Sequence, residues 1–152
     1  MSAQQPLDVL IGLARDAVDA ATRELGSLQA TRLQAERQLQ MLEGYLEDYR
    51  VRLQQAICGG LSAAAWQNYQ RFIGTLEGAI GEQRNVLRHA EGRLDDGRVS
   101  WQQETRKLNA FDTLAQRREQ AHALQALKRE QRATDEFAAQ QMRRRFQPET
   151  QS

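Results

Sequence analysis

The chain has 152 residues, of which 40% are hydrophobic, only 6% are aromatic and two are proline. This composition is typical of long helices or a coiled coil, and it excludes a thick, layered globular core. Twenty-one basic and twenty acidic residues nearly cancel, so net charge gives no reason to expect nucleic-acid or anionic-membrane binding, and a single cysteine excludes an internal disulfide.

A first helix is predicted over about residues 6–57. Steps of alternately four and three residues from Leu7 pass through apolar positions, with Arg32 the one charged member. This spacing is typical of the apolar seam of a left-handed coiled coil. The seam positions are Leu7, Ile11, Ala14, Val18, Ala21, Leu25, Leu28, Arg32, Ala35, Leu39, Leu42, Leu46, Tyr49, Leu53 and Ala56.

A turn is predicted at residues 58–62. Gly59 and Gly60 are each about 1 kcal/mol worse than alanine inside a helix, and both reach positive φ readily. Ser62 then supplies an N-cap oxygen for a new helix. The chain should therefore stop and restart within about six residues.

A second helix is predicted over about residues 63–146. The same steps from Trp66 define its seam, in which Gln83, Gly97 and Glu104 are the exceptions to apolar character. The full set is Trp66, Tyr69, Ile73, Leu76, Ile80, Gln83, Leu87, Ala90, Leu94, Gly97, Trp101, Glu104, Leu108, Phe111 and Ala115.

The two seams match in size when the second helix folds back on the first. Large residues then meet small ones, as dense packing requires. The predicted pairs are Ala56 with Trp66, Leu25 with Gly97, Ala21 with Trp101, Ala14 with Leu108 and Ile11 with Phe111. We therefore predict an all-α fold, a long antiparallel two-helix coiled coil in a single domain. A parallel homodimer of long helices is the alternative.

The second helix should project beyond the paired region by roughly 30 residues. Pairing ends where Leu7 meets Ala115, and the charge then changes from net −2 over residues 1–115 to net +3 over 116–152. A helix this polar is marginal alone in water and suits ordering by a partner. Residues 147–152 are expected to form a disordered tail.

No constellation of catalytic, cofactor-binding or metal-binding residues is apparent. His89 and His122 stand 33 residues apart on one predicted helix, and Cys58 has no histidine nearby in sequence. Two straight helices also offer no enclosed site for catalysis. We expect no enzymatic activity and no cofactor.

A second, shallow apolar stripe lies just past the turn, where Phe72 and Ala79 flank the seam and Leu76 and Gln83 lie on its edge. It consists of Phe72, Leu76, Ala79 and Gln83, at spacings of four, three and four. Such a stripe either docks another chain or merely widens the hairpin core. The spacing does not decide between these two readings.

Several segments resemble the FliJ family, the small cytosolic component of the flagellar type III export apparatus. The specific ones are Asn68–Glu77, with its tyrosine and phenylalanine, and Asp135–Ala138 near the end. Further matching stretches are Leu7–Leu13, Gln38–Leu42 with Tyr45, Tyr49-Arg50, and Trp101 followed by Lys107-Leu108. The similarity covers nearly the whole chain.

The resemblance implies a stalk-like coiled coil, similar to the central stalk of rotary ATPases. It implies binding to the hexameric export ATPase FliI with promotion of ring assembly, to the export-gate protein FlhA and to export chaperones. It also implies a cytoplasmic protein that is peripheral to the inner membrane at the flagellar base.

The resemblance further assigns candidate site residues. The gate contact falls on Phe72, Leu76, Ala79 and Gln83, the last standing where a relative carries histidine. The open end is expected to meet the ATPase or the chaperones. Its candidates are Arg117, Arg118, Leu124, Leu127, Arg129, Asp135, Glu136 and Phe137.

Two other functions stay open at this point. The same fold serves as the equivalent stalk of virulence type III secretion systems, which gene neighbourhood would distinguish. A nucleic-acid-binding coiled coil is the other, because the Arg143-Arg144-Arg145 cluster could contact phosphates.

Overall fold

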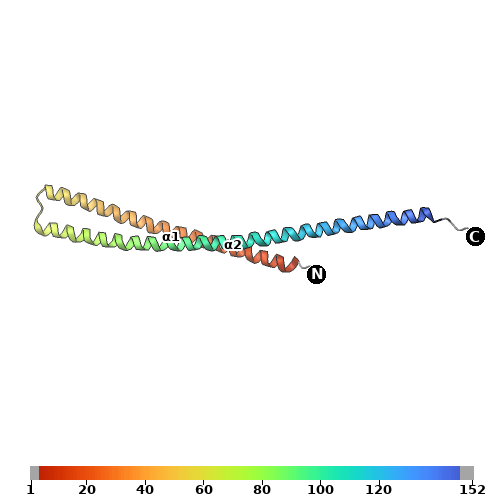
Figure 1. Cartoon of the computed structure of the whole chain (residues 1–152). Coiled ribbons are helices and arrows are strands. Elements are labelled where there is room, and N and C mark those ends of the chain that lie inside the picture. The colour runs from red at the N-terminus through yellow and green to blue at the C-terminus, as the bar shows by residue number, and fades with distance from the viewer. Residues whose placement is uncertain (1–3, 148–152) are drawn as a thin grey trace, which may run out of the picture. The chain divides into compact units, whose positions relative to one another are not determined.

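The computed structural model describes residues 4–147 and contains two helices (Figure 1). Helix α1 spans Gln4–Cys58 and helix α2 spans Ala63–Phe146. No strand occurs between residues 4 and 147, so the prediction of an all-α fold is confirmed. The chain divides into two compact units, residues 14–106 and residues 1–13 with 107–152. Residues 148–152 of the expected tail lie outside the described residues.

The turn between the helices is built by glycine on one side and serine on the other. Gly59 N–H donates to the Gln55 carbonyl (3.2 Å), and Gly60 follows with φ +86°, a left-handed conformation that favours glycine. On the far side, Ser62 Oγ accepts a hydrogen bond from Ala65 N–H at 3.2 Å. Ser62 is therefore the N-cap of α2, as predicted.

Within residues 14–106, α1 and α2 pack as an antiparallel hairpin. The predicted seam residues in this unit are buried or half-buried, with the exception of Trp66. No described side chain is buried completely, because a core only two helices thick leaves every residue near an edge. The buried side chains of the unit are Ala14, Leu28, Ala35, Leu53, Ile73, Leu76, Ile80, Ala90 and Leu94.

Two contacts fix the register of this hairpin. Gly97 lies so close to α1 that a β-carbon there would be 2.6 Å from Leu28 Cδ1 and 3.7 Å from Leu25 Cδ1. One helical turn further along, Trp101 Nε1 donates a hydrogen bond to Thr22 Oγ1 at 3.1 Å. Both contacts occur within one chain, in the antiparallel register expected from the sequence.

Trp66 departs from the expectation that it fills the core opposite Ala56. Its side chain is 46% exposed. Trp66 lies in the first turn of α2, beside the loop, where no further helical turn covers its outer side. Seam residues at the end of a hairpin are therefore less buried than the same positions in its middle.

The second unit contains the start of α1 and the later part of α2. Leu7 and Ile11 are buried, and Leu7 and Asp8 share a shallow depression with Ala115, Arg118 and Glu119. Every side chain from Glu119 to Gln147 is exposed. The later part of α2 therefore continues as an unpaired helix within this unit, as predicted.

Candidate functional site

Two faces of different chemistry flank the apolar core near the turn. In an antiparallel coiled coil, the positions on either side of the seam recur every seven residues. The charged face consists of Glu43 and Arg50 of α1 with Glu77 and Arg84 of α2. The aromatic face consists of Gln38, Tyr45 and Arg52 of α1 with Phe72, Ala79 and Val86 of α2.

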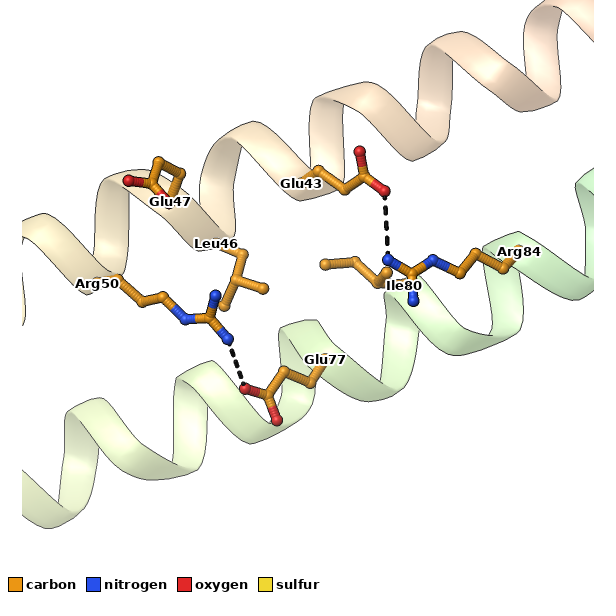
Figure 2. Close-up of a pocket in the computed structure, with 7 residues that line it drawn as sticks. All are labelled: Glu43, Leu46, Glu47, Arg50, Glu77, Ile80 and Arg84. Atoms are coloured by element: carbon orange, nitrogen blue, oxygen red, sulfur yellow. Dashed lines mark hydrogen bonds and ion pairs between the residues drawn. The ribbon is translucent and has the colours of Figure 1, made fainter.

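The charged face is held together by its own ion pairs (Figure 2). Arg50 Nη2 lies 3.1 Å from Glu77 Oε1, and Arg84 Nη2 lies 3.6 Å from Glu43 Oε1. The groove between the two pairs has a volume of about 390 Å³ and is open to solvent. Exposed pairs contribute only ~0.2–1 kcal/mol each. Because both arginines of this face are already paired across the helices, the face favours the hairpin register more than it favours a ligand.

The aromatic face carries a cluster of rings at its turn end. The Tyr49 ring centroid lies 4.2 Å from that of Phe72 and 6.4 Å from that of Tyr69, and both pairs are tilted. Such arrangements contribute ~0.5–1.5 kcal/mol beyond the area that they bury. The Arg52 guanidinium lies 5.3 Å from the Tyr49 centroid, within the range of a cation–π contact.

These rings form a surface pocket between the two helices. Its volume is about 340 Å³. The lining side chains are Tyr49, Arg52, Ala65, Asn68, Tyr69 and Phe72. The pocket therefore combines an apolar aromatic floor with a cation and an amide, a composition typical of recognition sites.

The four residues of the predicted stripe do not play the same structural part. Phe72 is 42% exposed although it packs on Tyr49, whereas Leu76 is only 8% exposed and belongs to the core. Ala79 and Gln83 are half-buried. Phe72 therefore both widens the core and stays accessible, and Leu76 supports the stripe from beneath.

Gln83 makes polar contacts with the opposite helix. Its Nε2 donates to the Ala35 carbonyl at 3.0 Å and to Gln38 Oε1 at 3.2 Å. The amide has two N–H donors, and these two acceptors satisfy both. A polar residue whose hydrogen bonds are made inside an apolar seam fixes the register of the two helices, at some cost in stability. Gln83 therefore has a structural part in the hairpin itself.

The sequence reasoning missed the contribution of Tyr49 and Arg52 to this surface. Tyr49 was assigned to the seam alone, and Arg52 was not singled out. The available signal was the seven-residue recurrence of Gln38, Tyr45 and Arg52 beside the seam, on the side that carries Phe72.

The candidates at the C-terminal end lie along a single helix and do not converge. Arg118 is half-buried beside Leu7 and Asp8, and the other candidates are exposed. Leu124, Leu127 and Phe137 are each more than half exposed. An unpaired helix with such apolar side chains suits binding by a partner.

The described residues contain no cluster of side chains that could hold a metal ion. Between residues 4 and 147, no three histidine, cysteine, aspartate or glutamate side chains are grouped closely enough to hold a metal ion. His89, His122 and Cys58 are all exposed. None of the helices in the described part of the chain is both long and apolar enough to cross a membrane.

The chain is similar to flagellar proteins over nearly its whole length. A protein-family model described as "Flagellar FliJ protein" matches residues 3–147. The flagellar FliJ protein of Salmonella typhi is 37% identical over 138 residues, which cover 91% of this chain and 94% of the relative. The flagellar FliJ protein of Escherichia coli K12 is 36% identical over the same shares. That of Buchnera aphidicola is 31% identical over 65 residues, 43% of this chain and 45% of the relative.

Proposed function

Because the chain belongs to the flagellar FliJ protein family, a component of the flagellar export apparatus, we propose that it is a non-enzymatic stalk and adaptor of this apparatus. In this role it binds the export ATPase FliI and promotes assembly of the hexameric ring. It also links the ring to the export-gate protein FlhA and interacts with export chaperones.

The observation that carries this proposal is the unpaired stretch of α2 in the second unit. All of its side chains from residue 119 to 147 are exposed, including Leu124, Leu127 and Phe137. A helix in a protein gains most of its stability by burying an apolar face against another element. A partner that covers this face, such as the inner surface of an ATPase ring or a chaperone groove, would supply that burial.

The gate contact is proposed on the aromatic face of the hairpin. Phe72 supplies the exposed apolar anchor, with Ala79 and Gln83 along the same side and Leu76 beneath them. Packing on Tyr49 holds the Phe72 ring in place before a partner arrives, which reduces the entropy lost on binding. The relatives reported above are flagellar proteins, so we do not favour the virulence-system alternative.

The location proposed for the chain follows from these partners. It is cytoplasmic and becomes peripheral to the inner membrane at the flagellar base when the ATPase and the gate hold it there. Fractionation of cells with and without the gate protein measures this dependence.

The stalk role is tested with the purified export ATPase from the same organism. Adding the full-length chain should increase both the hexamer fraction in size-exclusion chromatography and the rate of ATP hydrolysis. The double variant Leu124→Ala/Leu127→Ala should weaken this effect about tenfold, because each side chain loses apolar area at the contact. The matched control is Gln125→Ala/Gln131→Ala, which shortens two exposed side chains of the same stretch but removes mainly polar area. No gain in hexamers or hydrolysis with the unmodified chain would refute the role.

A further inference from the structure

The hairpin tip is unusual in charge. Residues 49–76, which contain the turn and the adjoining ends of both helices, carry three arginines and no aspartate or glutamate. The whole chain has twenty acidic residues among 152, so a run of this length without one stands out. The tip is therefore basic in a chain that is nearly neutral.

Two of the three arginines of the tip, Arg50 and Arg52, lie on different faces of the hairpin. Arg50 is on the charged face and pairs with Glu77. Arg52 is on the aromatic face, in contact with the Tyr49 ring, and within residues 4–147 it makes no salt bridge, although Asp48 precedes it by one helical turn. The Arg52 guanidinium therefore keeps its donors for a ligand.

The pocket beside Arg52 suits a particular kind of ligand. Its aromatic side chains Tyr49, Tyr69 and Phe72 offer apolar surface, and Asn68 offers an amide donor and acceptor at the edge. A volume of about 340 Å³ accommodates one or two side chains but not a folded element. Guanidinium groups pair with carboxylates through two parallel hydrogen bonds.

We propose that this pocket binds a short acidic protein segment, with an apolar or aromatic side chain packed on Phe72 and Tyr69 and a neighbouring carboxylate paired with Arg52. The inference rests on the proposed gate contact and specifies its chemistry. The part of the gate that meets the aromatic face carries acidic residues next to an apolar anchor. Because the tip has no carboxylates, it does not repel an acidic segment. Its arginines repel basic segments, which therefore bind less well.

The first test measures the affinity of the full-length chain for the purified cytoplasmic part of the export gate. Arg52→Glu should weaken binding at least tenfold and Arg52→Lys about threefold, because lysine keeps the charge but loses the planar fork. Arg88→Glu, the same charge change at an exposed site on α2 away from the pocket, should change affinity less than twofold. Circular dichroism should show equal helicity for all variants, since Arg52 and Arg88 are exposed.

A second test uses a defined probe. A fluorescein-labelled peptide with one phenylalanine flanked by glutamates should bind the wild-type chain, and binding should weaken severalfold between 50 and 300 mM salt. The same peptide with glutamine in place of glutamate should bind at least tenfold more weakly. Equal binding of the two peptides would overturn the inference, and so would preferential binding to phosphatidylglycerol vesicles that depends on Arg52.

The outcomes separate this inference from the proposed function. If Phe72→Ala abolishes gate binding but Arg52→Glu leaves it unchanged, the aromatic face docks the gate and the acidic-segment inference is wrong. If neither variant affects gate binding, the proposed gate contact fails as well.

Discussion

Gly97 and Leu28 approach each other so closely that a side chain at position 97 would force the Leu28 side chain to move. A β-carbon at Gly97 would lie 2.6 Å from Leu28 Cδ1, and Leu28 is itself buried. The glycine, unfavourable for a helix, is therefore explained by interhelical packing at this position.

This relationship makes two glycines of α2 differ in their response to substitution. Gly97→Val should lower the free energy of unfolding by about 1–3 kcal/mol, because it overpacks the space filled by Leu28. Gly92→Ala should raise it by about 0.5–1 kcal/mol, because nothing lies within 4 Å of the added carbon and alanine favours the helix. Urea denaturation followed by circular dichroism measures both changes. An equal gain in stability for Gly92→Ala and Gly97→Val would contradict the close packing.

Gln83 should limit the stability of the hairpin while selecting its register. Gln83→Leu removes a polar group from the seam and should raise the free energy of unfolding by about 1 kcal/mol. The Ala35 carbonyl is not left unsatisfied, because it lies inside α1 and accepts a backbone hydrogen bond of that helix. Gln38→Ala, which removes an exposed partner of the same amide, should change it by less than about 0.5 kcal/mol. Thermal denaturation provides the comparison. Loss of stability in Gln83→Leu would instead show that the hydrogen bonds to α1 are net stabilising.

Substitutions of Phe72 and of Leu76 should affect gate binding and the stability of the hairpin to different extents. Leu76→Ala should destabilise the hairpin by about 2–3 kcal/mol, because Leu76 belongs to the buried core. Phe72→Ala should cost about 1 kcal/mol, because Phe72 is partly exposed and loses mainly its packing on Tyr49. Denaturation curves and gate affinity are measured on the same samples. A single Phe72 variant is therefore a cleaner probe of docking than a double variant that includes Leu76.

The register of the hairpin can be checked without disturbing its core. Glu43 and Arg84 form an interhelical ion pair on the charged face. In a Cys58→Ser background, the pair Glu43→Cys/Arg84→Cys should crosslink with a short bismaleimide within one chain. The control Arg50→Cys/Arg84→Cys is displaced by a heptad and should react much less. Products at twice the chain mass on a denaturing gel would point to the parallel homodimer.

The core of the hairpin was predictable because the 3.5-residue spacing of apolar side chains persists in both helices. The opposition of Leu25 and Gly97 was predictable for a similar reason, since only small residues accommodate large ones across a narrow seam. Trp66 was mispredicted because a repeat does not indicate where the covering helix ends. The acceptors of Gln83 and the stacking of Arg52 on Tyr49 depend on rotamers, which residue spacing does not specify.

None of the side chains that the structure describes is completely buried, and this has a consequence for how the hairpin opens. In a globular domain, all elements pack against one common core. Within residues 14–106, each helical turn packs mainly against the turn opposite it on the other helix. Protection of amide hydrogens from exchange should therefore vary gradually along the hairpin rather than in one cooperative step. Such a structure can loosen locally at a partner-binding segment while the rest of its length keeps its pairing.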